Sequence, residues 1–252
     1  MVTPSPFKII LFDFGSTLIY SKNPWPPIYE QADRAMLQVL QQAGIPLEIK
    51  AFSSEFETFL DSYYAERGTS LVEKTTFSTL QELLQQKGFQ DVPAAVVRLA
   101  LAALYSITQQ NWHLESDTIP TLKTLQGLGY RLGMISNTSD DTNVQQLLDR
   151  WELRPFFETI ITSANCGIRK PDRRIFQLAL DHFGVPAEQV AMVGDSLEAD
   201  ILGANQLNIY SIWITRRVSL ADEGELAIQP QAAIPTLDLI PGLLADIENE
   251  VS

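Results

Sequence analysis

Five short apolar segments, each followed by polar residues, constrain the fold of this chain more than any other feature. They are rich in Ile, Val, Leu or Met and lie at residues 8–13, 131–136, 159–162, 190–194 and 210–214. Between the last four, apolar residues recur at helical spacing, notably in segments 142–150, 174–183 and 196–206. Strands that alternate with helices predict an α/β fold, a doubly wound parallel sheet covered on both faces. In such a sheet, ligands bind at the carboxyl ends of the strands.

The region from about residue 21 to residue 116 interrupts this alternation, because it shows helical spacing and no convincing strand. We expect helices near residues 28–43, 54–64, 73–87 and 93–110. This predicts a Rossmann-like core domain, residues 1–20 and 117–252, and a smaller all-helical domain, residues 21–116. The prolines of segment 23–27 would mark the first hinge between the core domain and the helical domain, because proline stops a strand and stiffens a linker. A last amphipathic helix is expected within residues 236–250, where Pro241 either delays its start or kinks it.

Charge and composition restrict the possible partners. The 252 residues include 31 acidic and 18 basic ones, a net charge of -13. Such a surface repels nucleic acid and anionic lipid on average, so an anionic substrate would need a locally positive pocket. The single Cys166 excludes an internal disulfide and a cysteine-based zinc site.

We therefore expect no nucleic-acid partner and no membrane partner. No secretion signal is visible, and no apolar segment reaches the length that spans a bilayer, so we expect a soluble cytoplasmic protein. No apolar stripe stands out from those that the helices need for folding, so the sequence makes no prediction of oligomeric state.

Polar residues that could carry chemistry follow four of the predicted strands. They are Asp13 at the end of the first, Ser136 and Asn137 at the close of the second, Lys170 after the third, and Asp195 and Asp200 after the fourth. Each residue alone has a structural explanation, such as a helix cap, a turn or a solvated lysine. Because the ends of parallel strands meet at one sheet edge, their coincidence favours a catalytic site.

This arrangement resembles the four motifs of the haloacid dehalogenase (HAD) superfamily, in its phosphatase-like branch. Asp13-Phe14-Gly15-Ser16-Thr17 is similar to the nucleophile loop, and Gly194-Asp195-Ser196 with Asp200 is similar to the fourth motif. Ser136 matches the hydroxyl of the second motif and Lys170 the lysine of the third. The resemblance covers about residues 7–20 and 118–215. The helical insertion after the first motif resembles the superfamily's helical cap.

The resemblance implies a hydrolase that acts on a small phosphorylated metabolite through an aspartyl-phosphate at Asp13. It implies Mg²⁺ as cofactor, with Asp13, Asp195 and the backbone carbonyl of Gly15 as protein ligands. Lys170 would neutralise the nucleophile, and Ser136 would donate a hydrogen bond to the transferred group.

The resemblance also implies supporting residues around this centre. Ser16, Thr17 and Asn137 would contact the substrate. Asp200 would orient Lys170 or the waters on the metal.

Gly15 departs from the superfamily pattern, which places a second aspartate there. In the family that aspartate protonates the leaving alcohol and then deprotonates the attacking water. Loss of a general acid/base costs about 10²- to 10⁴-fold in rate. Three outcomes stay open: an enzyme for good leaving groups such as acyl or aryl phosphates, a slow phosphatase, or a catalytically impaired protein that binds a phosphorylated ligand.

Two relatives in the superfamily also lack the second aspartate. Haloacid dehalogenases have a metal-free fourth motif, whereas Asp195 with Asp200 suits a cation. Phosphonoacetaldehyde hydrolases use a cap lysine that forms a Schiff base, activated by desolvation. Lys22, Lys50 and Lys74 lie in the insertion, and nothing in the sequence marks any of them as buried. Both activities remain alternatives.

Overall fold

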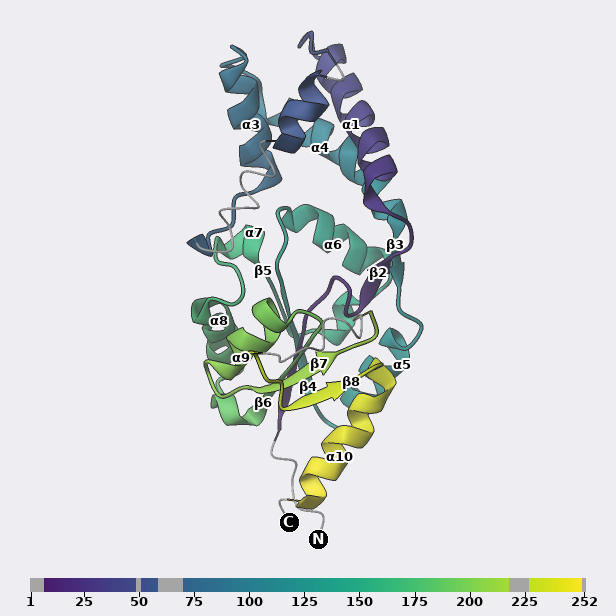
Figure 1. Ribbon diagram of the computed structural model, residues 1–252, viewed down its shortest axis with the longest axis vertical. Coiled ribbons are helices and arrows are strands. Elements are labelled where there is room, and N and C mark those ends of the chain that lie inside the picture. Colours follow the sequence, from purple (N-terminus) through teal and green to yellow (C-terminus); the bar gives the residue numbers. More distant parts are fainter. Residues whose placement is uncertain (1–6, 49–50, 59–69, 218–226, 251–252) are drawn as a thin grey trace. The chain divides into compact units, whose positions relative to one another are not determined.

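The computed structural model describes residues 7–48, 51–58, 70–217 and 227–250. The chain divides into two compact units, which Figure 1 traces from the amino terminus to the carboxyl terminus. Unit 1 comprises residues 1–20, 114–137 and 148–252, and unit 2 comprises residues 21–113 and 138–147. Within the described ranges, no helix combines the length and the apolar character needed to cross a bilayer.

A six-stranded sheet forms the centre of unit 1, in the order β5-β4-β1-β6-β7-β8. Its strands are β1 (Ile9–Phe12), β4 (Arg131–Ser136), β5 (Thr159–Thr162), β6 (Val190–Gly194), β7 (Tyr210–Ile214) and β8 (Ala232–Ile234). All neighbouring pairs run parallel. The predicted doubly wound α/β fold is confirmed, and the first five strands lie where the sequence predicted them. The sequence did not predict β8, because three residues are too few to show a strand pattern.

The register of the sheet brings the strand ends level. Phe12 at the end of β1 lies opposite Met134 on one side and Val193 on the other. Asp13 therefore leaves the sheet beside the last residues of β4 and β6. This alignment is what gathers residues far apart in sequence at one edge.

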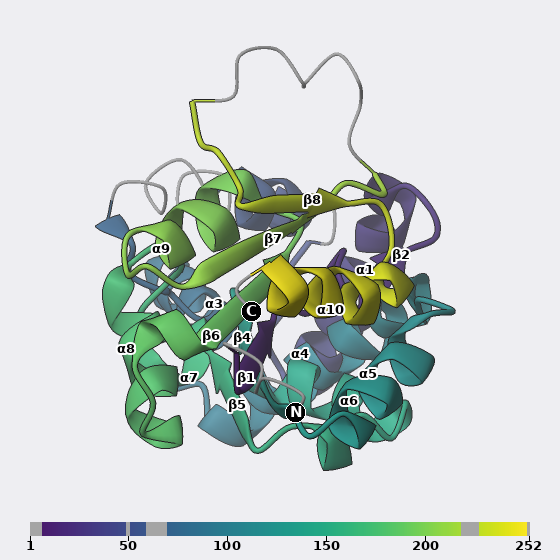
Figure 2. The ribbon, with the colours of Figure 1, turned by 90° about the horizontal axis from the view of Figure 1, so that it is seen from below.

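Helices cover both faces of the sheet in unit 1, as Figure 2 shows. One face carries α8 (Arg173–Phe183) and α9 (Leu202–Asn205), and the other carries α5 (Thr118–Gly127) and α10 (Ile240–Glu250). Alternate residues of β1, Ile9 and Leu11, pack in one buried cluster with Phe176 of α8. Ile10 and Phe12, which alternate with them, are also fully buried, so the two-residue period of the strand supplies apolar side chains to both faces of the sheet.

Shorter elements complete unit 1. They are α7 (Ser163–Cys166), the 3-10 turns Arg154–Phe156, Ala187–Gln189 and Leu237–Leu239, and a π-helical turn at Leu197–Ile201. The predicted tail helix begins at Ile240 as α10, so Pro241 lies in its first turn and the start is delayed. Proline is tolerated there because the first N–H groups of a helix have no partner within it.

Unit 2 is built on the helices α1 (Trp25–Gln42), α3 (Thr76–Gln86) and α4 (Ala94–Thr108), followed by a 3-10 turn at Gln109–Asn111. Their apolar faces share one core, which includes Met36, Leu80 and Leu101. Residues 51–58 are also helical, while the rest of the expected helix 54–64 lies outside the described residues. The helix α6 (Asp141–Arg150) starts in unit 2 and ends in unit 1.

The structure corrects two predictions for the inserted region. The proline segment is not all linker, because α1 begins at Trp25 and prolines occupy its first turn. The expectation of no strand is wrong for β3 (Trp112–Leu114), which pairs with β2 (Ile19–Ser21) in a two-stranded sheet. Each strand has three residues, too few to show a period of two in the sequence.

Candidate active site

The loop after β1 carries Asp13, a buried carboxylate with 7% exposure. Its backbone N–H donates to the carbonyl of Val193 at 2.8 Å, which ties the loop to the end of β6. The chain then turns sharply: Ser16 has φ 64°, and the N–H of Leu18 donates to the carbonyl of Phe14 at 2.9 Å. A residue with a Cβ is strained at positive φ, and such strain is concentrated at functional sites.

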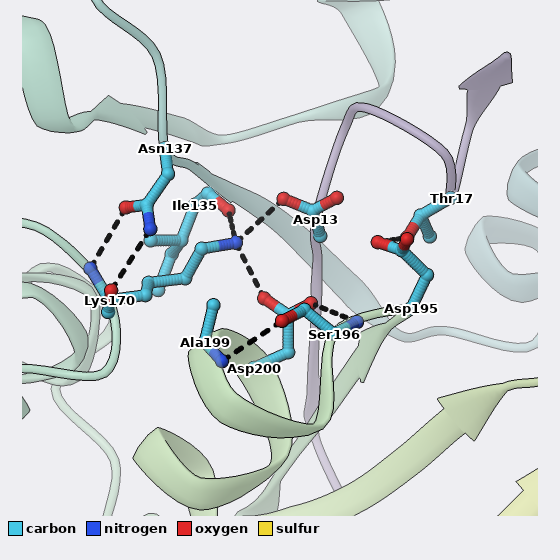
Figure 3. A network of polar contacts seen from close by, with 9 residues as sticks. All are labelled: Asp13, Thr17, Ile135, Asn137, Lys170, Asp195, Ser196, Ala199 and Asp200. Atoms are coloured by element: carbon cyan, nitrogen blue, oxygen red, sulfur yellow. Dashed lines mark hydrogen bonds and ion pairs between the residues drawn. The ribbon is translucent and has the colours of Figure 1, made fainter. Parts of the chain in front are cut away.

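Lys170 lies at the centre of a buried polar network (Figure 3) and is 3% exposed. Its Nζ is 2.6 Å from Oδ1 of Asp13 and 2.6 Å from Oδ1 of Asp200. It also donates to the carbonyl of Ile135 at 2.6 Å. The ammonium group thus meets three oxygens, those of Asp13 and Ile135 through hydrogen bonds and that of Asp200 as an ion pair. The structure thus brings together the lysine and two of the acidic residues that the sequence singled out.

Burial and mutual repulsion shape the protonation of this cluster. Burial lowers the pKa of Lys170, but the charges of Asp13 and Asp200 outweigh it and raise that pKa above its usual value. Lys170 is therefore an ammonium ion. Burial raises the pKa of Asp200 to about 6, although the charge of Lys170 opposes the shift. Burial, followed by the charges of Asp13 and Asp200, raises the pKa of Asp195 to about 7.

Asp195 follows β6 and is held from two sides. The indole Nε1 of Trp213, on β7, donates to its backbone carbonyl at 2.9 Å. The hydroxyl of Thr17, which is 1% exposed, donates to its Oδ1 at 3.5 Å. Nothing in the sequence pointed to Trp213, which lies inside an apolar strand. This contact ties the loop after β6 to the neighbouring strand.

Asp200 is placed by the π-helical turn Leu197–Ile201, a rare geometry that is frequent at functional sites. Its Oδ2 accepts from the backbone N–H of Ser196 at 3.0 Å. A Cβ added at Gly194 would lie 2.3 Å from Cγ of Asp200, so the strand end and the carboxylate fit only because residue 194 is glycine.

Ser136 and Asn137 close β4 at the same edge. Ser136 is the last residue of the strand and is 4% exposed. The side-chain amide of Asn137 makes two hydrogen bonds to the main chain of Lys170: Nδ2 donates to the carbonyl at 3.0 Å, and Oδ1 accepts from the N–H at 2.8 Å. The structure thus places the side chain of Asn137 in direct contact with the main chain of Lys170.

The acidic residues also fit a divalent cation. One carboxylate oxygen from each of Asp13, Asp195 and Asp200 lies within 4.8 Å of the others. Both carboxylate oxygens of Asp200 have partners, Oδ1 in Lys170 and Oδ2 in Ser196, whereas Lys170 contacts only Oδ1 of Asp13, so Asp13 and Asp195 are the better ligands. Carboxylate oxygens are the donors that Mg²⁺ prefers, and a cation would offset the excess negative charge that Lys170 alone does not balance.

The lysines considered for a Schiff base do not show the burial that this chemistry requires. Lys22 is exposed, and the side chain of Lys74 is 34% exposed and paired with Glu82. Lys50 lies outside the described residues. A Schiff-base lysine needs a depressed pKa, usually through desolvation or a cationic neighbour. Neither described candidate has a desolvated side chain.

Comparisons with known proteins identify the family. Residues 7–208 match the family of haloacid dehalogenase-like hydrolases. The haloacid dehalogenase-like hydrolase domain-containing protein 3 of Danio rerio is 29% identical over 241 residues, 95% of this chain and 97% of that protein. The glyceraldehyde 3-phosphate phosphatase of Methanothermobacter thermautotrophicus is 27% identical over 215 residues, 85% of this chain and 88% of that protein.

A solved structure shares the fold. The 2-haloacid dehalogenase of Pseudomonas syringae pv. Tomato has a TM-score of 0.68 at 22% identity, and the alignment covers 96% of this chain and 99% of that one. The family match, residues 7–208, includes the strands β1, β4, β5 and β6 and the positions of Asp13, Ser136, Lys170 and Asp195. The chain is a hydrolase of the haloacid dehalogenase-like family.

Proposed function

We propose that the protein is a Mg²⁺-dependent phosphatase that acts on a small phosphorylated metabolite through an aspartyl-phosphate at Asp13. The observation that carries this proposal is the buried ion pair of Lys170 with Asp13, at 2.6 Å, beside a second carboxylate suited to a cation. The relative named glyceraldehyde 3-phosphate phosphatase supports a phosphorylated metabolite as substrate.

In the proposed reaction, Asp13 is the nucleophile. Oδ1 of Asp13 is held by Lys170, which leaves Oδ2 to attack phosphorus. The new bond joins Oδ2 to phosphorus, and the ester bond breaks with its electron pair on the leaving oxygen. Lys170 and Ser136 stabilise charge on the phosphoryl oxygens, which is the main task of a phosphoryl-transfer site. Water then hydrolyses the aspartyl-phosphate.

The metal would be held by Asp13, Asp195 and the backbone carbonyl of Gly15. When bound, Mg²⁺ neutralises phosphate charge that would otherwise repel the nucleophile. Thr17 and Trp213 keep Asp195 in place for this role through the contacts described above. Ser16, in the turn after Gly15, would bind the phosphate through its backbone N–H.

Gly15 has no side chain that could protonate the leaving group. We therefore propose that the preferred substrates have good leaving groups, such as acyl or aryl phosphates, which need little protonation. The helical segment 21–116 is proposed to act as the cap domain that selects the substrate. The single Cys166 leaves no internal disulfide, which supports the proposal of a cytoplasmic enzyme.

Gly15 also favours a second candidate function, a catalytically impaired protein that binds a phosphorylated ligand. A steady-state assay with p-nitrophenyl phosphate, with and without Mg²⁺, separates the two in wild type, Asp13→Asn and Gly15→Asp. We expect Mg²⁺-dependent turnover in wild type that Asp13→Asn abolishes. Activity that appears only in Gly15→Asp would favour the impaired protein. Release of chloride from 2-chloropropionate without metal would contradict both.

A further inference from the structure

We infer that Asn137 is a positioning residue, which fixes the active-site lysine by clasping its main chain. This inference rests on the proposed function, because it explains how the proposed site keeps Lys170 in place. The two hydrogen bonds, 3.0 Å and 2.8 Å, run in opposite directions between one amide and one residue's N–H and carbonyl. The same pair of hydrogen bonds joins residues of neighbouring β-strands, but here the side-chain amide of Asn137 takes the place of one strand's backbone.

The clasp matters because Lys170 lies in a loop between α7 and α8, outside any helix or strand. No helical or sheet ladder of hydrogen bonds sets the position of its backbone. Asn137, in contrast, directly follows β4, which is paired on both sides by β1 and β5. The amide therefore transfers the rigidity of the central sheet to the loop that carries the lysine.

The position of the loop decides the geometry at Nζ. The ammonium group meets three acceptors at 2.6 Å each, on Asp13, Asp200 and the carbonyl of Ile135. A backbone shift of about 1 Å would lengthen these contacts beyond good hydrogen-bond distance, and a misplacement of that size costs up to about 10²-fold in rate.

Positioning differs from the substrate contact that the sequence predicted for Asn137. Two of the amide's hydrogen-bonding groups, Oδ1 and one N–H of Nδ2, are used by Lys170. A residue that binds the substrate affects KM, because it acts in the ground state. A residue that places Lys170 affects kcat, because the lysine acts on charge that develops in the transition state.

The kinetic test uses Asn137→Asp, which keeps the shape of the side chain but sets an oxygen in place of Nδ2 against the carbonyl of Lys170. We expect kcat for p-nitrophenyl phosphate to fall about 10- to 100-fold, with KM within about twofold of wild type. Asn249→Asp, at an exposed position on α10, adds the same charge and should leave both constants unchanged. A raised KM with normal kcat in Asn137→Asp would overturn the inference.

A double-mutant cycle with Lys170→Met tests whether Asn137 acts through the lysine. If it does, Asn137→Asp has no further effect on kcat in the Lys170→Met background. An equal loss of kcat in both backgrounds would show an independent role and overturn the inference.

A third measurement needs no turnover and so separates this inference from the proposed function. Reductive methylation with mass spectrometry should label Lys170 slowly in wild type and at least several-fold faster in Asn137→Ala, while the exposed Lys8 is labelled equally in both. Asn137→Ala also serves if Asn137→Asp fails to fold. If Lys170 is methylated equally slowly in both proteins, the positioning role of Asn137 is refuted. If wild type is inactive but shows the expected labelling, only the proposed phosphatase function is refuted.

Discussion

A single methyl group added at Gly194 should disrupt the active site by displacing Asp200, which contacts Lys170. In Gly194→Ala the new Cβ would lie 2.3 Å from both Cγ and Oδ2 of Asp200. Ordinary contacts begin at 3.4 Å, so the carboxylate must move by about 1.1 Å. Asp200 is 1% exposed, so the residues packed around it must also adjust.

The displacement has two costs. Overpacking a dense interior costs about 1–3 kcal/mol. Moving Asp200 also weakens its ion pair with Lys170, and loss of one partner from a buried pair costs about 3–5 kcal/mol. The two costs are not additive, because the same movement of Asp200 that relieves the steric clash also weakens the ion pair. We therefore expect a loss of about 3–5 kcal/mol in the free energy of unfolding. Lys170 then keeps Asp13 but loses its second carboxylate, so kcat should fall at least about tenfold.

Thermal unfolding followed by circular dichroism, together with steady-state kinetics on p-nitrophenyl phosphate, checks this prediction. The matched control is Gly242→Ala in α10, where an added Cβ meets nothing within 4 Å. A helix gains up to about 1 kcal/mol when alanine replaces glycine, so the control should be as stable as wild type or more so. A Gly194→Ala protein with wild-type melting temperature and kcat would refute the steric argument.

Three further predictions follow from the site and from unit 2. Lys170→Met should lower kcat at least about 10²-fold, because the buried carboxylate of Asp13 loses its counter-charge; an active variant would remove the lysine from the mechanism. EDTA should abolish turnover and added Mg²⁺ should restore it, whereas metal-independent turnover would contradict the proposed cation site. Burial raises the pKa of Asp33 in α1 to about 6, opposed by a hydrogen bond from Ser53. The folded state then holds a proton that the unfolded state has lost, so stability falls as pH rises from about 4 to 6. At pH 7, Asp33→Asn should stabilise the protein by about 1–2 kcal/mol after allowance for solvent screening, and the gain should vanish below pH 4 in urea unfolding; an equal gain at both pH values would contradict this origin.

The fold class could be predicted from the sequence because its signals are local. A buried parallel strand reads as a short apolar run, and the five runs that were predicted correspond to β1, β4, β5, β6 and β7. A polar residue that ends such a run must lie at the carboxyl edge of the sheet. The elements that were missed, β2, β3 and β8, have three residues each, so their pairing partners rather than their own patterns define them.

The residue types of the candidate site could likewise be listed from strand ends, but their contacts could not. The substrate contact of Asn137 stays a prediction, and nothing in the sequence indicated the hydrogen bonds between Asn137 and residue 170, 33 positions along the chain. The sequence identified Gly194 only as part of a motif, whereas the structure shows that the lack of a side chain at Gly194 makes room for Asp200. It offered no sign that Trp213 binds the carbonyl of Asp195.

The sequence by itself therefore determined the parallel sheet, the edge where chemistry can occur and the absence of a second aspartate at Gly15. Only the tertiary structure decided which polar groups meet at that edge and which of them serve Lys170. The physical reason is the sequence separation over which these interactions act. Strand and helix periods arise between near neighbours along the chain. The hydrogen bonds between residues 137 and 170, and the steric fit between residues 194 and 200, depend on how the whole sheet aligns the ends of its strands.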